Sequence, residues 1–537
     1  MGSYDYATYP FVRPPELDGG GGTRLVAIIG AGPVGLTLAL DLAMRGVPVV
    51  VLDDADVVSV GSRAICWAKR TLEIWDRLGV ADRMVAKGVT WQVGRVFDGE
   101  RELYRFDLLP EGGHKMPAFI NLQQYYVEQY LIERCADFPD LIELRWKSEV
   151  TAHDDDGAGV TLKVSTPEGA YAIRCERVVA CDGARSPTRR RMGLAFAARI
   201  FEERFLIADV RMQAPFPNER LFWFDPAFHA GGSALLHKQP DDVYRLDFQL
   251  GPGADPEAER QPDRVVPRVR AVVGETPFEL EWCSVYSFRC ARLERFVHGR
   301  IIFAGDSAHV VSPFGARGGN GGVHDADNLG WKLALVLSGD APAALLDSYE
   351  EERGHGADEN ISNSARTTTF MTPKSAAETR FRDGVLALSS DLPFARALLN
   401  AGRLSRPCSL AGHPLQGEGA LVGLACPDAP VTVGGAPAWL LAQFGTGFTV
   451  MTFADPEEAP DPSDLAALRP ACRLLVIASR GAGVVDAEGL VAQRYGAVAG
   501  TTFLIRPDTH VAARFDTFDP AALAIAQARA SAMPPRP

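Results

Sequence analysis

A six-residue glycine pattern, GAGPVG at residues 30–35, is the first feature of the sequence that could do chemistry. It fits G-x-G-x-x-G, in which Gly30 permits a tight turn, Gly32 lets a pyrophosphate approach the backbone, and Gly35 lets the next helix pack close to the strand. An apolar run precedes the pattern and a helical run follows it. We therefore expect dinucleotide phosphates to be bound by Gly30, Gly32, Pro33, Val34 and Gly35.

Two carboxylates complete this pattern. Asp53 lies 23 residues after Gly30, at the end of the next apolar run, where an acidic side chain binds ribose hydroxyls. Asp53 and its neighbour Asp54 would repel a 2′-phosphate, so the pair argues against NADP in this pocket. The glycine pattern alone does not distinguish FAD from NAD.

A second glycine-rich stretch, GDSAHVVSPFGARGGNGG, covers residues 305–322 and leads directly into a helical pattern. Glycine lets the backbone approach a ligand closely, and the helix start offers free N–H groups and a positive dipole end. We expect an anion or an electron-rich group to be bound there. Asp182-Gly183 and Asp306 each follow a buried-looking strand, and the three motifs occur in a fixed order along the chain.

The elements that must position these motifs follow from the hydrophobic pattern. Continuous apolar runs predict buried strands at 25–29, 47–52 and 177–181, and helical spacing predicts helices at 33–45 and 323–338. We expect a helix-rich region from about 53 to 134, a mostly antiparallel sheet within 200–290, and a final α/β unit after a linker at 406–437.

Together, GAGPVG, GSRA (61–64), DGARS (182–186) and GDSAHVVSPFGARGGN resemble the class A flavoprotein aromatic hydroxylases, the FAD monooxygenases of the para-hydroxybenzoate hydroxylase type. The resemblance covers about residues 24–370. The nearest subgroup is that of the 3-(3-hydroxyphenyl)propionate and phenol hydroxylases, whose thioredoxin-like extension is similar to residues 419–515. The extension has no C-x-x-C, so we expect no thiol–disulfide chemistry from it.

The resemblance implies an α/β fold with a doubly wound FAD-binding domain of the glutathione-reductase-type Rossmann class, an inserted β-sheet substrate domain and a C-terminal thioredoxin-like domain. The expected divisions are an N-terminal arm (1–22), the FAD-binding domain in two parts (23–195 and 295–373), the substrate-binding sheet domain (196–294), a helical connector (374–410) and the thioredoxin-like domain (411–537).

Site residues follow from the same resemblance. Asp306 would bind the ribityl chain of FAD, and the 313–320 loop would lie beside its isoalloxazine ring. Further FAD contacts would come from Arg63, Gln124, Asp182, Gly183, Gly305, Pro313, Gly318, Gly319 and Asn320. The expected catalytic residues are Arg245, Pro313, Arg317, Tyr244 and His229.

The implied reaction is hydroxylation of a phenolic or other electron-rich aromatic substrate, with NAD(P)H as a transient co-substrate, O2 and a flavin C4a-hydroperoxide. In phenol hydroxylases an aspartate stands two residues after the Arg63 position, whereas this chain has Ile65, so another group must activate the substrate. Besides Tyr244 and His229, we consider His237, Tyr286 and Trp223 as substrate contacts.

Other functions stay open at this point. An NAD dehydrogenase would leave GDSAH and ARGGN unexplained, and a flavin halogenase would need a W-x-W-x-I-P segment that the sequence lacks. A flavin-dependent oxidoreductase acting on a non-phenolic substrate and a catalytically silent FAD-binding partner protein are the remaining alternatives. A metal at His309, His324 and Asp327 explains the segment less well than a flavin, so we expect none.

Composition sets further limits. The net charge of −13 argues against nucleic acid and anionic membranes as partners. The longest apolar candidate, 25–40, is shorter than the roughly 20 residues that span a bilayer, and we expect no signal peptide. Nine cysteines without a pairing framework favour a cytoplasmic protein. The sequence leaves a homodimer open.

Overall fold

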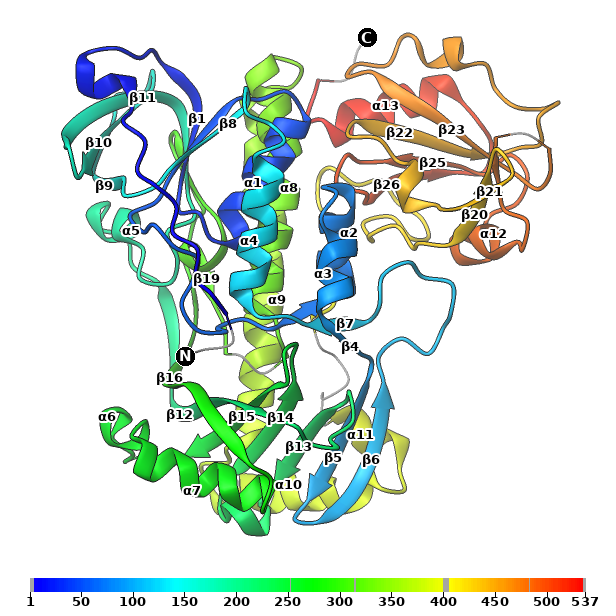
Figure 1. Ribbon diagram of the computed structural model, residues 1–537. Helices are drawn as coiled ribbons and strands as arrows, with labels where there is room; N and C mark the ends of the chain where they lie inside the picture. The colour runs from blue at the N-terminus through cyan, green and yellow to red at the C-terminus, as the bar shows by residue number, and fades with distance from the viewer. Residues whose placement is uncertain (1–3, 252, 313–314, 399–404, 482, 535–537) are drawn as a thin grey trace.

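The computed structural model describes residues 4–251, 253–312, 315–398, 405–481 and 483–534, without the side chains of 198–203 and 288. Within these ranges the strands form three large sheets and one small sheet (Figure 1). In this view the first sheet lies at the upper left and the C-terminal sheet at the upper right, with helices between them, and the second sheet lies below. The α/β fold expected from the sequence is confirmed.

The first sheet carries the predicted buried strands. Its order is β17-β18-β11-β1-β2-β8, and β1 lies parallel to both β2 and β11. Its strands are β1 (Arg24–Ile29), β2 (Val49–Leu52), β8 (Ile142–Arg145), β9 (Glu149–Asp155), β10 (Val160–Thr166), β11 (Gly169–Ala180), β17 (Val297–His298) and β18 (Ile301–Phe303). Because the carboxyl ends of parallel strands meet at one edge, the turns after β1, β2, β11 and β18 come together.

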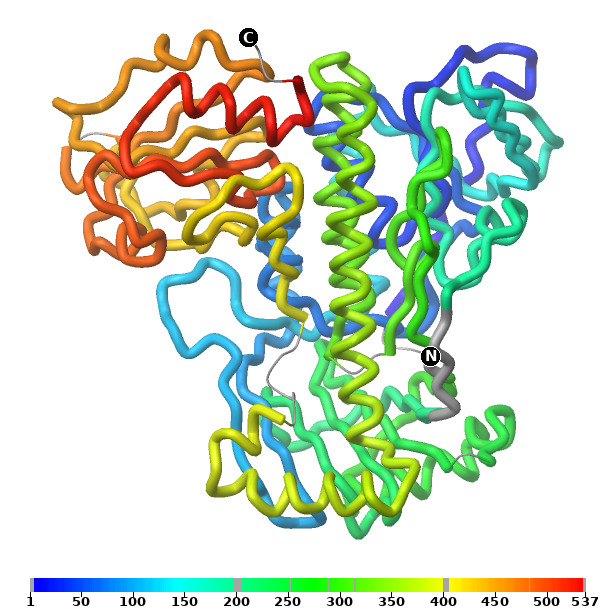
Figure 2. The backbone as a smooth tube through the Cα atoms, turned by 180° about the vertical axis from the view of Figure 1, so that it is seen from behind, coloured from blue at the N-terminus to red at the C-terminus, as the bar shows by residue number. Residues whose placement is uncertain are grey.

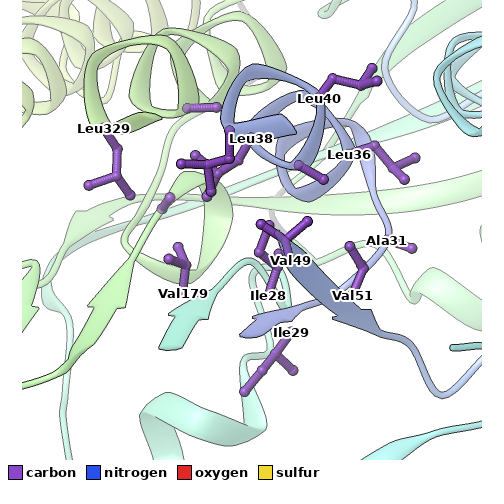
Figure 3. Packing of buried hydrophobic residues seen from close by; sticks show 14 of the residues in the cluster. Ile28, Ile29, Ala31, Leu36, Leu38, Leu40, Val49, Val51, Val179 and Leu329 are labelled. Carbon is purple, nitrogen blue, oxygen red and sulfur yellow. The ribbon is translucent and has the colours of Figure 1, made fainter. Parts of the chain in front are cut away.

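Helices cover this sheet with apolar side chains. They are α1 (Pro33–Met44), α4 (Gln124–Cys135), α8 (Gly318–Ser338) and α9 (Asp347–Met371). Figure 3 shows Leu36 and Leu38 of α1 above Ile28 of β1 and Val49 of β2, and all four are at most 5% exposed. Replacing one of these leucines with alanine would cost about 2–5 kcal/mol. The α8 helix ends at Gly339, whose φ of 78° suits a left-handed cap.

The second sheet is the mostly antiparallel one expected within 200–290. Its order is β19-β16-β12-β15-β14-β13-β5-β6. Its strands are β5 (Val93–Asp98), β6 (Arg101–Asp107), β12 (Ala197–Met212), β13 (Arg220–Phe224), β14 (Ser233–Lys238), β15 (Val243–Leu250), β16 (Phe278–Arg292) and β19 (His309–Val310).

The β5–β6 hairpin corrects one prediction, because it lies in the region expected to be rich in helices. That region does hold α2 (Lys69–Arg77), α3 (Ala81–Lys87) and α4, but also the small sheet of β3 (Cys66–Ala68), β4 (Val89–Trp91) and β7 (Phe119–Asn121). In the hairpin, Val96 and Leu103 are buried in one apolar cluster with Phe222 and Phe224 of β13. Parallel pairing of β5 with β13, which is distant in the sequence, stabilises the hairpin. The residues around β5 do not predict this pairing.

The two faces of the second sheet have different neighbours. Val265 and Val269 of α7 (Pro262–Val273) pack on one face. The other face meets the C-terminal end of α9, which runs along the back of the molecule (Figure 2).

The chain has further helices, which are α5 (Pro187–Arg191), α6 (Pro256–Glu259), α10 (Ala376–Ser389), α11 (Pro393–Leu398), η1 (Pro15–Asp18), η2 (Ala227–His229), η3 (Gly305–Ser307), η4 (Ala343–Leu346), η5 (Leu441–Gln443) and η6 (Pro462–Leu465).

The C-terminal unit is the final α/β unit predicted from the sequence. Its mixed sheet has the order β21-β20-β24-β23-β22-β25-β26. The elements are β20 (Pro430–Val433), β21 (Ala436–Trp439), β22 (Phe448–Phe453), β23 (Cys472–Ala478), β24 (Val484–Val485), β25 (Thr502–Ile505), β26 (Val511–Phe515), α12 (Leu490–Tyr495) and α13 (Pro520–Ala530).

A buried ionic network joins the C-terminal unit to α8 and α9. Arg506 donates to Glu352 at 2.6 Å, Lys332 lies 2.7 Å from the same carboxylate, and all three side chains are fully buried. Asp508 accepts from Arg506 and from Trp331. Burial of so many paired charges fixes how the two units meet. Among the described residues, we find no helix with the length and apolarity to cross a membrane.

Candidate active site

The glycine turn between β1 and α1 has the geometry that its sequence predicts. Gly30 has a φ of +107°, and a Cβ there would lie 2.6 Å from the carbonyl oxygen of Cys181. A Cβ on Gly35 would lie 2.1 Å from the carbonyl oxygen of Gly30. The α1 helix starts after Gly32 with no side-chain cap, so its first N–H groups are available to an anion.

Asp53 closes the other side of this turn. Its carboxylate accepts N–H groups from Ala31 at 2.6 Å and from Ala55 at 2.9 Å. Burial raises the pKa of Asp53, and these two hydrogen bonds oppose the rise. The side chain thus ties the end of β2 to the glycine turn while it also lines the cavity described next.

A cavity of about 1480 Å³ is lined both by the glycine turn and by the start of α8. Most of the predicted cofactor residues line it, and they come from several separate parts of the chain. Those that line it are Gly30, Gly32, Pro33, Val34, Asp53, Asp54, Arg63, Gln124, Asp182, Gly183, Asp306 and Gly319.

Asp182 presents an unsatisfied acceptor to this region. One carboxylate oxygen accepts the N–H of Thr188 at 3.0 Å, and the other is buried with no partner among the described residues. Gly183, next to it, has a φ of +76°. A buried acceptor without a donor costs free energy, so a hydroxyl-bearing or N–H-bearing ligand would stabilise this corner.

The turn around Arg63 is held by the second sheet. Arg63 has a φ of +44°, and its carbonyl oxygen accepts from Arg245 at 2.7 Å. Arg245 also donates to Asp209 at 3.1 Å, and the Ser62 hydroxyl bonds to both of these side chains. Arg245 therefore anchors the turn that brings Arg63 to the cavity.

Gln124 holds the other side of the same turn. Its amide oxygen accepts the N–H of Ala64 at 3.3 Å, and its amide nitrogen donates to Ser59 and Glu128. Burial raises the pKa of Glu128, which also accepts the N–H of Ser59 at 2.6 Å. Gln124 lines the cavity, and its contact with FAD stays a prediction.

The start of α8 forms the far end of the cavity. A Cβ on Gly319 would lie 2.9 Å from the Trp67 ring, so only a glycine lets the helix start so close to it. The Asn320 amide bonds to four groups, including the N–H of Ala68 at 2.9 Å and the carbonyl oxygen of Ala316 at 2.6 Å. Asn320 therefore positions this helix start. Pro313 lies outside the described residues.

Arg317 is buried rather than solvated. It is 5% exposed, it donates to the Asn360 side chain at 3.0 Å, and burial lowers its pKa. With Gly318 it lines a smaller cavity beside the first one, and this position puts a cation next to the positive end of the α8 dipole.

The turn after β18 rests on a buried carboxylate of α8. Asp325 accepts the N–H of Gly305 at 2.9 Å, the ring of His309 at 2.6 Å and Arg353 at 2.6 Å. Although burial opposes it, His309 and Arg353 lower the pKa of Asp325 to about 2. Gly305 therefore does not line the cavity, whereas the next residue, Asp306, does.

A second cavity of about 530 Å³ opens from the first. The two share Arg63, Trp67, Tyr286, Asp306 and Gly319 as lining residues. The second is walled mainly by apolar side chains of β12, β14 and the β3 segment, and it falls in the size range of small-molecule sites. Its apolar lining includes Ile65, Phe205, Ile207, Leu235 and Val311.

The predicted substrate contacts divide according to strand face. Arg245, His237 and Tyr286 line the second cavity. Tyr244, the neighbour of Arg245, points to the opposite face of β15 and donates to the Ala214 carbonyl at 2.9 Å. His229 lies 2.6 Å from the Gln249 carbonyl, outside both cavities.

Trp223 also lies outside both cavities, where its ring stacks on Phe97. Sequence reasoning missed Arg220 and Asp247, which line the second cavity. A signal for Asp247 was available, because residues two apart on a strand share a face and Arg245 was already placed there.

In the described part of the chain, no three His, Cys, Asp or Glu side chains are grouped so that they could hold a metal ion. His309 pairs with Asp325, and Asp327 pairs with Arg70 and Arg77.

The residues present fit FAD. The cradle at Gly30 and Gly35 leaves no room for a Cβ, and the uncapped α1 start suits a pyrophosphate. The unpaired oxygen of Asp182 calls for a donor, and the cavity continues past Asp306 to the α8 start, where an anionic ring edge would meet a helix N-terminus.

Known proteins resemble this chain in sequence. A 3-(3-hydroxy-phenyl)propionate/3-hydroxycinnamic acid hydroxylase of Mycolicibacterium smegmatis is 29% identical over 370 residues, which are 68% of this chain and 65% of that protein. The chain thus matches slightly less than two thirds of this relative's length. A flavin-dependent monooxygenase of Mycobacteroides abscessus is 33% identical over 351 residues, 61% of this chain and 70% of that protein.

The fold is shared over nearly the whole chain. The flavin-dependent monooxygenase PieE, solved in complex with FAD and substrate, superimposes with a TM-score of 0.79 at 23% identity and covers 95% of this chain and 99% of its own. The resemblance inferred from the motifs is confirmed. Residues 23–364 match the family described as FAD binding domain, and the chain belongs to this family.

Proposed function

We propose that the chain is a single-component monooxygenase that uses FAD, NAD(P)H and O2 to hydroxylate a phenolic or other electron-rich aromatic substrate. The observation that carries this proposal is the meeting of the two cavities at the start of α8, where both contact Gly319 and Asp306. The first is lined by the glycine turn and Asp53, and the other is smaller and mainly apolar. The hydroxylase and monooxygenase names of the relatives support the same reaction.

The overall reaction consumes one aromatic substrate, O2, NAD(P)H and a proton, and yields the hydroxylated ring, water and NAD(P)+. Bound FAD supplies the electron transfer and the activation of O2. The chain itself would bind the pyrophosphate at the glycine turn, the ribose at Asp53 and the ribityl chain at Asp306. Gly183, Gly318 and the backbone around Asn320 would complete the pocket.

The second cavity would orient the substrate and exclude water. Its apolar walls would hold the ring, while Arg317 and the α8 start would stabilise negative charge at the cofactor's ring edge. Arg245 would fix the Arg63 turn between cofactor and substrate. We keep the proposed division in which the sheet at 196–294 binds substrate, with the β5–β6 hairpin added to it.

Two further parts of the proposal concern partners and location. All nine cysteines are free thiols, which supports a reducing, cytoplasmic location. The net charge of −13 supports small molecules rather than nucleic acid or membranes as partners. Sedimentation of the purified protein would test whether it forms a homodimer.

The test is oxidation of NADH and of NADPH by the FAD-loaded protein, with and without a panel of phenols that includes 3-(3-hydroxyphenyl)propionate. The masses of the products would be measured by mass spectrometry after turnover under 18O2. We expect one phenol to accelerate oxidation and to gain one labelled oxygen. Acceleration that yields only peroxide, or none with any ring compound, would favour a different flavin oxidoreductase or a silent FAD-binding partner.

A further inference from the structure

Three polar side chains from three adjacent strands form one end of the second cavity. Arg220 lies on β13, His237 on β14 and Asp247 on β15, and all three line the cavity. The register that pairs Leu221 with Leu236 brings Arg220 beside His237. We call these residues the Arg220–His237–Asp247 cluster.

The cluster has no internal partners to satisfy it. One carboxylate oxygen of Asp247 and the Nδ1 atom of His237 are buried and accept or donate no hydrogen bond within the described part of the chain. Arg220 forms no hydrogen bond or ion pair with any described side chain, and its partly exposed side chain lines the cavity. Buried polar groups are nearly always paired. Two unpaired buried atoms beside an unpaired guanidinium therefore indicate the place of a polar ligand group.

The charges of the cluster limit what that group can be. His237 is neutral, because burial holds its pKa well below the ordinary value. Burial raises the pKa of Asp247 to about 6, although Arg245 and Arg220 oppose the rise. Above that pH the cluster holds one carboxylate, one guanidinium and one neutral imidazole. Other groups that face it are Asp209 on β12, Cys66 on β3 and Tyr286 on β16.

A hydroxyl group fits this set better than a carboxylate does. A substrate carboxylate would face Asp247 and be repelled, whereas a hydroxyl can donate to Asp247 and accept from Arg220. Burial strengthens both interactions. The position that holds an aspartate in phenol hydroxylases is Ile65, which lines the same cavity and has no proton acceptor.

We propose that the Arg220–His237–Asp247 cluster binds the ring hydroxyl of the phenolic substrate, and that Asp247 accepts its proton while Arg220 neutralises the resulting phenolate. The inference rests on the proposed function. The O–H bond breaks, its electron pair stays on oxygen and enriches the ring, and the proton moves to Asp247. Once product leaves, the carboxyl group returns the proton to water. His237 orients the oxygen through its neutral ring.

The first experiment measures binding and needs no turnover. The FAD-loaded enzyme is titrated with 3-methylphenol and, as a matched probe without a hydroxyl proton, with 3-methylanisole. Difference absorbance reports phenol or phenolate. We expect bound phenolate at pH 8, where the free phenol (pKa about 10, as for tyrosine) is neutral, and at least tenfold weaker binding of the ether. Equal affinities with no phenolate band would overturn the inference, whether or not any variant folds.

The second experiment compares Asp247→Asn with Asp242→Asn. Asp242 is an exposed residue in the turn before β15 with a φ of +56°, which asparagine tolerates, so the control makes the same charge change outside the cavity. We expect Asp247→Asn alone to lose the phenolate band and the acidic limb of the kcat/KM profile near pH 6, with hydroxylation reduced at least tenfold. Unchanged behaviour of Asp247→Asn would contradict the inference.

Failure of the proposed function gives a different result. In that case the wild-type enzyme would bind phenolate in the Asp247-dependent way without inserting oxygen into it. Arg220→Met supplies a further check, since loss of the guanidinium should raise the pH at which bound phenolate forms, and an unmoved titration would count against the assignment.

Discussion

Replacing Arg245 with methionine tests whether the second sheet holds the cofactor turn through a buried ion pair. Arg245 and Asp209 are 5% and 2% exposed, and their charged atoms are 3.1 Å apart. At an effective dielectric constant of about 20, two unit charges at that distance attract by about 5 kcal/mol. Methionine fills similar volume but leaves the Asp209 carboxylate buried without its cation.

We therefore expect Arg245→Met to lower the free energy of unfolding by about 3–5 kcal/mol, the usual cost of breaking a buried pair from one side. Adding Asp209→Asn removes the stranded charge, so the double variant should regain about 1–3 kcal/mol. Because Arg245 also binds the Arg63 carbonyl, both variants should bind FAD more weakly than wild type.

The assay is urea unfolding of the three proteins (wild type, Arg245→Met and the double variant) at one fixed FAD concentration, followed by circular dichroism and by flavin fluorescence. Fixed FAD is needed because a ligand of the native state adds to apparent stability. If the double variant is no more stable than Arg245→Met, then the loss of the ion pair does not explain the lost stability, and the inference that this pair holds the Arg63 turn is wrong.

Three other predictions concern the turns and the domain contact. Gly35→Ala should yield protein without FAD, because its Cβ would lie 2.1 Å from the carbonyl oxygen of the turn's first glycine; Gly354→Ala, with open space around its Cβ, is the control, and flavin content is the measurement. Asp325→Asn should remove about 2 kcal/mol at neutral pH. Because the folded pKa of this aspartate is lowered from 3.8 to about 2, its contribution is present above pH 4 and is lost as pH falls towards 2, so the wild-type and variant curves should converge there. Glu352→Gln leaves Lys332 without its carboxylate partner and Arg506 with Asp508 alone, and should lower the urea midpoint by the equivalent of about 3–5 kcal/mol, with faster proteolysis between the units; an unchanged midpoint would show that the network is not needed for docking.

Most residues of the first cavity could be predicted from sequence, because the backbone geometry that they need depends on residues nearby in the chain. A positive φ at Gly30 and the space limit at Gly35 depend on neighbouring residues and on one strand–helix contact. Asp182 and Asp306 follow buried strands, whose apolar runs are visible in the sequence. Where these strands pair in parallel, their ends meet, so motifs far apart in the chain predict one site.

The residues that line the second cavity could not be predicted from sequence in the same way. Its walls come from several strands, and a side chain faces the cavity or turns away according to strand register. Tyr244 and Arg245 are neighbours, yet only Arg245 lines the cavity. The β5–β6 hairpin was missed for the same reason. Its partner β13 lies more than 100 residues away, and the sequence of neither segment predicts the pairing.

This difference has a consequence for how the two cavities can change. Substitutions at Phe205, Leu235 or Asp247 alter side chains that line the second cavity alone, so they can change which ring is bound without touching a group that holds the dinucleotide. Arg63 and Gly319 line both cavities, so a change there affects cofactor and substrate together. Under the proposed function, substrate preference would therefore be determined mainly by the second sheet, and the proton acceptor would lie on β15 instead of at the Ile65 position while the cofactor motifs stay unchanged.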